Sequence, residues 1–355
     1  MTAVKKNPPI ILFIVGSCLL LLYVLKKNPP KSIISKYRND QVSENVVQQD
    51  DINQNQSNVL SEEKEAALIT PSPKRKVPLG VVVNDYSNKN GEISELEKEL
   101  GIKISTIGIY KQFGLDYNKD LNEADLAFIK TNAKTLLLTW EPWNPKEGMN
   151  QSVDYLKEIN DGKLDSYLSN FAQQVKGYSS PVILRFAHEM NGNWYPWGNR
   201  PLEYKEAYRK VVDTFRKEGA ANVRFMWSIN HESVPPEAIS NSSKYYPGDS
   251  YVDIIGLDGF NFGSSKGSSN WKSFPELFSS SYNFVTTRYP SKPVMISEVA
   301  STELGGNKSA WVNDMFTRLA VVPKVSEIIW FNLIKETDWR IDSSQSSLQS
   351  FKKNL

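Results

Sequence analysis

Short apolar runs recur along the chain from Pro78 onward. Each run spans four to seven residues, and several are apolar at nearly every position, as expected for strands that are covered on both faces. The runs are Leu79–Val83, Lys103–Ile109, Thr135–Trp140, Val182–Ala187, Val223–Ser228, Val252–Leu257, Val294–Ser297 and Glu327–Phe331.

The segments between these runs have the spacing of amphipathic helices. They are Ser94–Leu100, Val153–Val175, Leu202–Phe215, Glu276–Thr287 and Ser309–Leu319, with Ser344–Leu355 as a closing helix. Strands that alternate with helices predict a parallel sheet, and eight such units predict an α/β fold of the (β/α)8 TIM barrel type. An open doubly wound sheet is the alternative, but no G-x-G-x-x-G follows the first run.

A different pattern occupies the N-terminus. Ile10–Leu25 is apolar and uncharged, and two lysines flank it on each side. As a helix it is about 24 Å long, slightly short of a hydrocarbon layer of ~30 Å, and the lysines can extend its reach. We therefore expect residues 1–27 to form a single-pass membrane anchor, with a transmembrane helix over about 10–25. A cleaved signal peptide and a lipoprotein signal ending at Cys18 are the alternatives.

Residues 28–77 are rich in Asn, Gln, Ser, Lys and Glu, which predicts a flexible, disordered linker. The C-terminal domain is then 78–355, and we expect it to lie outside the cytoplasm. The chain has one cysteine, so the domain must be held by its core rather than by intrachain disulfides. The net charge of +2 gives no reason to expect a nucleic-acid partner. We expect a monomer.

Two glutamates stand at the ends of predicted strands. Alternation places Arg185, Ala187 and Glu189 on one face of the fourth strand, and Glu298 ends the seventh. The carboxyl ends of the strands carry the active site in this fold. Two carboxyl groups about 5–5.5 Å apart are what a retaining glycosidase requires, one protonated and the other ionised.

Aromatic residues support carbohydrate binding, since flat rings cover the C–H faces of sugars. All nine tryptophans lie between Trp140 and Trp339. Trp143 and Trp194 occupy polar loops, which favours a cleft, whereas Trp227 fits core packing equally well. Three carboxylates near predicted strand ends fit hydrogen-bonding roles: Asp85, Glu141 and Asp258. The polar residues after the eighth run fit either a cleft or a solvated loop: Lys335, Asp338 and Arg340.

The string Arg185–Trp197, RFAHEMNGNWYPW, strongly resembles the acid/base signature of glycoside hydrolase family 26, best known for β-mannanases. Ile296–Glu298 resembles the family's nucleophile strand. Tyr245–Asp258 resembles its approach to strand six, and Trp330–Asn332 resembles the end of its strand eight. The resemblance implies a retaining (β/α)8 enzyme without metal or cofactor. It implies endo cleavage of a β-linked polysaccharide: a mannan, a mixed-linkage β-glucan or an exopolysaccharide.

Carried over by position, the resemblance makes Glu189 the acid/base and Glu298 the nucleophile. It implies substrate-binding roles for His188, Asn191, Trp194, Trp197, Trp143, Phe260 and Trp330. Phe260 is a departure, because relatives often have a tyrosine near the nucleophile there. This departure leaves a catalytically inactive carbohydrate-binding barrel as the alternative function. A zinc site built on His188 and His231 is disfavoured by their spacing, and Glu232 is a second candidate for the acid.

Overall fold

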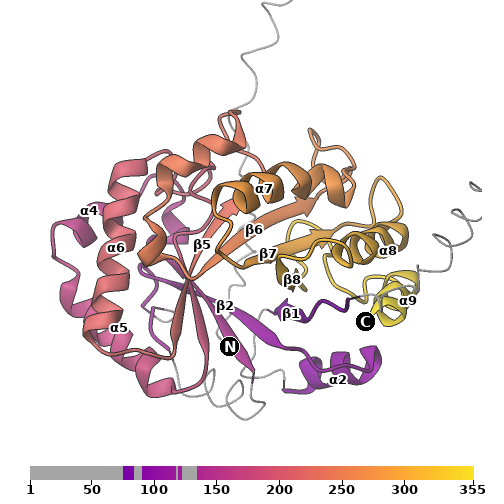
Figure 1. The fold of residues 1–355 in the computed structure, drawn as a ribbon, viewed down its shortest axis with the longest axis horizontal. Coiled ribbons are helices and arrows are strands. Elements are labelled where there is room, and N and C mark those ends of the chain that lie inside the picture. Colours follow the sequence, from indigo (N-terminus) through magenta and orange to yellow (C-terminus); the bar gives the residue numbers. More distant parts are fainter. Residues whose placement is uncertain (1–74, 84–89, 117–118, 122–133) are drawn as a thin grey trace, which may run out of the picture. The chain divides into compact units, whose positions relative to one another are not determined.

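Eight parallel strands form a closed barrel in the computed structural model, which describes residues 75–83, 90–116, 119–121 and 134–355. The strands follow one another in chain order, and β8 pairs with β1 to close the barrel (Figure 1). This confirms the barrel predicted from the apolar runs. The strands are β1 (Leu79–Val82), β2 (Thr106–Gln112), β3 (Thr135–Glu141), β4 (Val182–Phe186), β5 (Val223–Asn230), β6 (Ile254–Asn261), β7 (Val294–Ser301) and β8 (Val325–Phe331).

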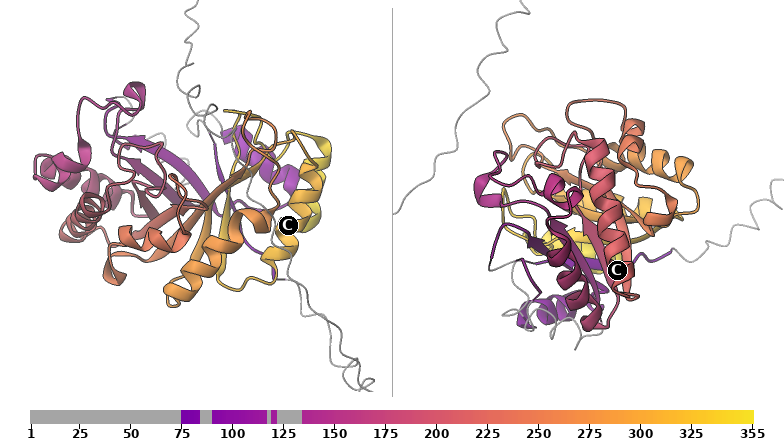
Figure 2. Two further views of the ribbon diagram at one scale, coloured as in Figure 1. Left: turned by 90° about the horizontal axis from the view of Figure 1, so that it is seen from above. Right: turned by 90° about the vertical axis from the view of Figure 1, so that its left-hand side faces the viewer.

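Helices lie around the outside of the strands (Figure 2). Those in the described residues are α2 (Asn90–Leu100), α4 (Tyr155–Asn160), α5 (Asp165–Tyr178), α6 (Pro201–Lys217), α7 (Phe274–Arg288), α8 (Lys308–Leu319) and α9 (Gln345–Asn354). The single helical stretch expected over Val153–Val175 is wrong, because α4 and α5 are separate. Gly162, between them, has a φ of 84°, which interrupts helical backbone.

Three tryptophans fill the layer between the barrel and its surrounding elements. Trp140 of β3 stacks on Phe171 of α5, with ring centroids 4.2 Å apart. Trp227 of β5 packs edge-on against Tyr246 and Tyr289. Trp330 of β8 packs against Trp311 of α8 and Phe351 of α9. All three are completely buried, so their rings stabilise the barrel by removing apolar area from water.

The inside of the barrel is polar toward the carboxyl ends of its strands. Arg185 of β4 is fully buried and donates hydrogen bonds to Thr139 of β3 and Asp258 of β6, both at 3.0 Å. Ser228 of β5 and Ser297 of β7 join the same network. Because buried charges need partners, this network fixes the positions of the rim side chains.

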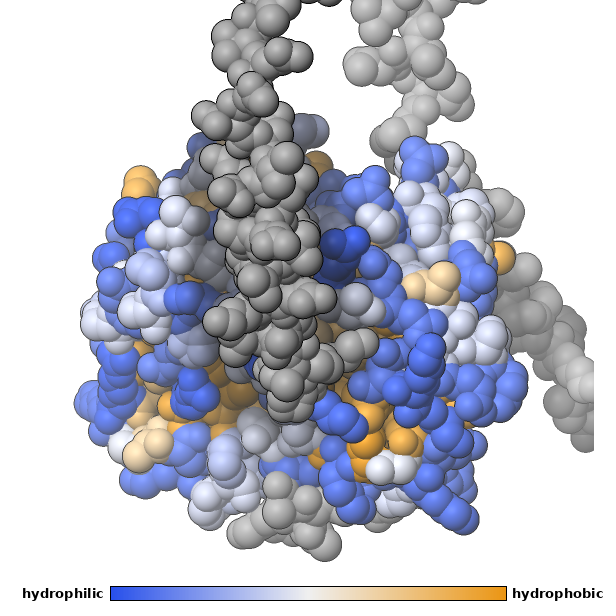
Figure 3. Space-filling model, turned by 45° about the vertical axis from the view of Figure 1, so that its right-hand side comes forward, coloured by the Kyte–Doolittle hydropathy of each residue, from blue (hydrophilic) through white to orange (hydrophobic). Residues whose placement is uncertain are grey.

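The predicted membrane anchor and linker fall on residues 1–77, which lie almost entirely outside the described ranges. Within those ranges, no helix combines the length and apolar character needed to cross a bilayer. The face of the molecule in Figure 3 is mainly hydrophilic, with hydrophobic residues gathered in smaller patches.

Candidate active site

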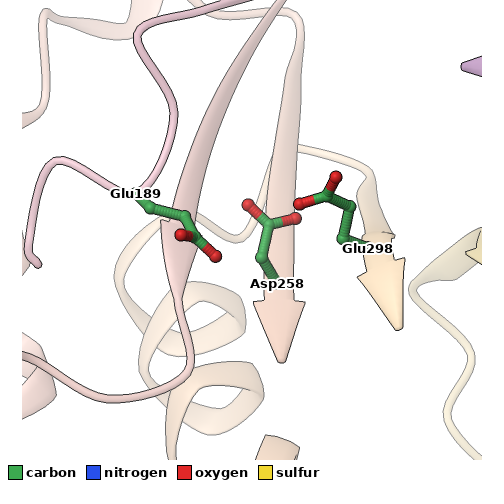
Figure 4. Close-up of side chains that lie close together, drawn as sticks. All are labelled: Glu189, Asp258 and Glu298. Atoms are coloured by element: carbon green, nitrogen blue, oxygen red, sulfur yellow. The ribbon is translucent and has the colours of Figure 1, made fainter. Parts of the chain in front are cut away.

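Three carboxyl groups turn toward one another at the carboxyl end of the barrel (Figure 4). Glu189 follows β4, Asp258 lies in β6 and Glu298 lies in β7, where it pairs in register with Asp258. One oxygen of each lies within 4.8 Å of the others. The two acids predicted from the sequence are therefore within reach of one sugar ring. This bound applies to one oxygen of each group, and it is close to the ~5–5.5 Å between the carboxyl groups of retaining glycosidases.

Glu189 reaches the site through an unusual backbone rather than by continued strand alternation. β4 ends at Phe186, and both Ala187 and Glu189 have positive φ, 46° and 54°. The Glu189 amide then donates to the carbonyl of Ser228 at 2.9 Å. The alternation predicted over residues 187–189 is thus wrong, although the predicted direction of Glu189 is right. Positive φ in residues other than glycine costs free energy and persists where neighbours enforce it, often at functional sites.

Two N–H groups hold the Glu189 carboxyl group. Asn230 Nδ2 donates to Oε1 at 2.8 Å, and Trp194 Nε1 donates to Oε2 at 2.7 Å. Burial raises the pKa of Glu189 to about 7, and Asp258 adds to this shift, whereas Asn230, Trp194 and Arg185 oppose it. This pKa suits a group that donates and accepts a proton near neutral pH.

Glu298 instead faces a cation. Arg185 Nη2 lies 3.0 Å from Glu298 Oε1, as an ion pair without an aligned hydrogen bond. Burial raises the pKa of Glu298 to about 8, Lys335 lowers it and Glu336 raises it. The Arg185 guanidinium favours the ionised form, because a fixed cation at this distance stabilises a carboxylate. Burial opposes this effect, because the pKa of Glu298, about 8, is higher than that of Glu189, about 7. The ion pair with Arg185 is the observation that favours Glu298 as the ionised member of the pair, since Glu189 has no cation at ion-pair distance among the described residues.

Asp258 positions the arginine that serves Glu298. Its two oxygens accept from Arg185 Nη1 at 3.0 Å and from the hydroxyls of Ser228 and Ser297 at 2.6 Å each. A Cβ on Gly256 would lie 2.4 Å from Ser297 Oγ and 2.6 Å from Ser228 Oγ. Glycine at 256 therefore makes room for both hydroxyls. Asp258 is completely buried and saturated with donors, which fits the hydrogen-bonding role expected for it.

An aromatic wall stands beside Glu189. The His188 ring is buried, and its Nε2 lies 3.1 Å from the Tyr195 hydroxyl. Burial, together with the charges of Arg185 and Lys335, lowers the pKa of His188 well below its usual value, so this side chain is neutral. Tyr195 stacks on Trp197 at 4.3 Å, and Trp143 meets both rings edge-on. Trp143, Trp194 and Tyr195 are half-buried, so parts of their rings remain open to a ligand.

Three predicted sugar contacts are wrong as direct contacts. Asn191 is buried, and its amide donates to the Asn230 and Glu232 carbonyls and accepts from the Asn230 amide, so it joins two loops instead. Trp197 is 1% exposed and donates to the His188 carbonyl, which makes it a support for Tyr195. Trp330 faces α8 and α9 and is 0% exposed.

Phe331, the next residue along β8, points the other way from Trp330. Its ring meets Phe260 at 5.3 Å, and Phe260 also contacts Phe262 and Trp339. Phe260 is half-buried, and its role in substrate binding stays a prediction. Side chains alternate along a strand, and applying this rule to β8 would have separated Trp330 from Phe331.

Arg185 and Asn230 hold the two glutamates, yet neither residue was assigned a role from the sequence. Alternation placed Arg185 on the face toward the barrel axis. A cation on that face, between two predicted carboxyl groups, could have indicated its role. Asn230 had no such signal, because its contact with Glu189 depends on the irregular backbone after β4.

Comparison with known proteins gives consistent matches. The family model described as "Glycosyl hydrolase family 26" matches residues 85–288. Endoglucanase H of Acetivibrio thermocellus is 34% identical over 275 residues, which are 74% of this chain and 29% of that protein. A mannan endo-1,4-beta-mannosidase of Bacillus subtilis is 29% identical over 170 residues, 44% of this chain and 43% of that protein. The chain thus spans less than half the length of these relatives.

The fold also matches solved structures. A modular endo-beta-1,4-mannanase from Cellulomonas fimi superposes with a TM-score of 0.61 at 17% identity, over 79% of this chain and 70% of that one. At this identity the likeness concerns the fold alone. The family match covers more than half of the chain and includes Glu189, in agreement with the resemblance noted in residues 185–197. The chain belongs to glycosyl hydrolase family 26.

Proposed function

We propose that this chain is a retaining, endo-acting glycoside hydrolase that cleaves a β-linked polysaccharide, with Glu189 as acid/base and Glu298 as nucleophile. The main support is the approach of the two carboxyl groups within 4.8 Å, in environments that differ in charge. The relatives are named as endoglucanases, mannan endo-1,4-beta-mannosidases and beta-1,3-xylanases, which supports a polysaccharide backbone as the substrate.

In the first step, protonated Glu189 donates its proton to the glycosidic oxygen while the Glu298 carboxylate attacks the anomeric carbon. The bond to the leaving sugar breaks, and a covalent glycosyl-enzyme forms at Glu298. Asn230 and Trp194 donate to Glu189, and these hydrogen bonds strengthen as its carboxyl group becomes negative. Arg185, 3.0 Å from Glu298, stabilises the ionised form that attacks.

In the second step, the Glu189 carboxylate takes a proton from a water molecule, whose oxygen attacks the anomeric carbon and releases Glu298. Two inversions at the same carbon give net retention. The short distance between the acids supports this sequence, because an inverting enzyme must fit a water between them.

The alternative is a carbohydrate-binding barrel without turnover, which the Phe260 departure favours. Glu189→Gln and Glu298→Gln separate the two functions. We expect each variant to keep the thermal unfolding profile of the wild type and to lose hydrolysis. Unchanged hydrolysis in either variant would remove its glutamate from the mechanism, whereas tight binding by a wild type that releases no reducing ends would support the binding barrel.

The substrate is best identified with a panel of mannan, mixed-linkage glucan, β-1,3-xylan and acidic exopolysaccharides, with released reducing ends counted. Endo cleavage predicts a rapid fall in solution viscosity with few new ends. Release of a single short product from the earliest times would instead indicate exo cleavage.

We also propose that residues 10–25 anchor the enzyme in a membrane, on the strength of their apolar sequence and flanking lysines. The full chain should then stay with membranes after a wash in high salt, and a chain that starts at Pro78 should not. Release of the full chain by salt alone would contradict the anchor.

A further inference from the structure

Two lysines lie on loops that flank the nucleophile strand. β7 stands between β6 and β8 in the barrel. Lys266 belongs to the loop after β6, and Lys335 belongs to the loop after β8. The loops meet through Phe262 and Trp339, whose rings are 5.1 Å apart. We call Lys266, Lys335, Phe262 and Phe331 the basic rim.

Lys266 has no anionic partner in the described part of the chain. Its Nζ lies 3.5 Å from the centroid of the Phe262 ring, and no carboxylate there comes within 4.0 Å of it. Lys272, in the same loop, differs because its Nζ pairs with Glu232 at 2.9 Å. Burial lowers the pKa of Lys266, while Glu336 and Glu189 raise it. The Lys266 ammonium is therefore within electrostatic range of the proposed acid/base.

Lys335 is 64% exposed, and its Nζ lies 6.0 Å from the Phe331 ring centroid. Its carboxylate partner, Glu336, is 3.4 Å away and also accepts from Trp339 Nε1 at 3.2 Å. One carboxylate therefore faces two lysines, which leaves a surplus positive charge on the basic rim.

Both loops are held in place by the chain itself. Gly263 has a φ of 49°, and a Cβ on it would lie 1.9 Å from the Leu304 carbonyl oxygen, so only glycine fits this turn. Ser269 Oγ donates to the Gly263 carbonyl at 2.7 Å. On the other loop, buried Lys308 donates to the Arg340 carbonyl at 2.7 Å and to Ser343 Oγ at 2.8 Å. The loops that carry the basic rim are therefore fixed before a ligand binds, which limits the entropy lost on binding.

The basic rim contrasts with the cleft that it borders. Glu141, Glu189, Asp258 and Glu298 are buried carboxyl groups of the cleft, and Arg185 is the buried cation among them. A neutral sugar chain can accept hydrogen bonds from these lysines but gains little from their charge. An anionic chain would be repelled by the carboxylates unless a nearby cation offset them.

We propose that the basic rim binds an anionic substituent of the polysaccharide, a carboxylate or a sulfate ester, beside the sugar attacked by Glu298. This inference rests on the proposed function and narrows its substrate class to acidic β-linked polysaccharides. The half-buried ring of Phe262, beside which Lys266 lies, offers a surface to the sugar, and the two lysines take the charge.

The test uses one neutral β-linked polysaccharide and two derivatives of the same backbone and length, one partly oxidised to carboxylates at C6 and one partly sulfated. We expect higher kcat/KM on a charged derivative, and a decline with added salt that the neutral chain does not show. Lys266→Gln should lower kcat/KM on the charged chain about two- to fivefold and leave the neutral chain unchanged. Lys335→Gln also changes the charge near Glu298, so it should lower kcat/KM on both chains, with the larger loss on the charged chain. The derivative that responds identifies the anion.

Lys272→Gln is the matched control, because it removes a paired lysine from the loop that carries Lys266. The inference would be overturned by equal losses of kcat/KM on neutral and charged chains, or by no loss in either rim variant. Hydrolysis of the neutral chain would still leave the proposed function intact. Binding to the Glu298→Gln variant in affinity electrophoresis repeats the comparison without turnover. If neutral and charged polysaccharides retard the Glu298→Gln protein to the same extent in that gel, the inference would also be overturned.

Discussion

The two sides of the active site hold chemically identical side chains in opposite ways. On the β4 side, Glu189 follows an irregular backbone and accepts hydrogen bonds from two neutral groups, Asn230 and Trp194. On the β7 side, Glu298 lies within a strand, beside shifts of register with both neighbouring strands, and faces the Arg185 cation. Both carboxyl groups are buried, so burial does not distinguish them. The difference lies in the charge of their nearest partners, and this charge supports Glu189 as the protonated acid of the proposed mechanism.

Removal of the cation should have the largest effect among the residues that support the two acids. Arg185→Met leaves Asp258 and Glu298 buried without their positive partner, which should lower the free energy of unfolding by about 3–5 kcal/mol. Activity should fall as well, because Glu298 then holds its proton to higher pH. Thermal unfolding and the pH dependence of kcat/KM measure the two effects. Arg185→Lys, which keeps the charge, should recover part of the stability, and failure to do so would point to lost packing instead.

Removal of a neutral donor should have a smaller effect on the other side of the site. Trp194→Phe deletes one hydrogen bond to Glu189 and keeps most of the ring. A hydrogen bond to a charged group contributes about 1.5–3 kcal/mol, so kcat should fall roughly ten- to a hundredfold. The pKa of Glu189 should rise, since this donor lowers it, and the alkaline limb of the pH–rate profile should move to higher pH. A limb that moves to lower pH would contradict the role of Trp194.

The pH dependence of the wild type tests the same assignment without a large perturbation. The pKa of Glu189 is raised from 4.5 to about 7, so kcat/KM should fall as the pH rises through about 7. Between these two values the folded chain binds a proton that the unfolded chain has lost, so the free energy of unfolding should decrease with pH there. Glu298, whose pKa is also raised, contributes to the same slope, so Glu189→Gln should reduce the slope without abolishing it. An unchanged slope in the variant would show that another group takes up the proton.

The smallest change concerns the departure at position 260. Phe260→Tyr adds one hydroxyl near the rings of Phe331 and Trp339. Since Arg185 already contacts Glu298, we expect kcat to change less than fivefold, of the order of one net hydrogen bond or less. A gain of two orders of magnitude in kcat would show that the missing hydroxyl limits the enzyme.

The fold followed from the sequence because the apolar runs and helical spacings repeat with little interruption. Glu189 and Glu298 could also be identified from the sequence, since each comes just after a predicted apolar run. The errors occur where a side chain's direction depends on details that the pattern does not fix. Trp330 and Phe331 are adjacent aromatics with opposite directions. Asn191 has the composition of a sugar ligand, but its amide is used within the chain.

The rescue of two truncated variants by azide tests the difference between the two sides most directly. With an activated β-glycoside, Glu298→Ala plus azide should give the α-glycosyl azide, because azide takes the place of the missing nucleophile. Glu189→Ala plus azide should give the β-glycosyl azide, because azide attacks the glycosyl-enzyme on Glu298. NMR of the anomeric centre distinguishes the two products. The same anomer from both variants, or the two anomers exchanged, would contradict the assignment of roles.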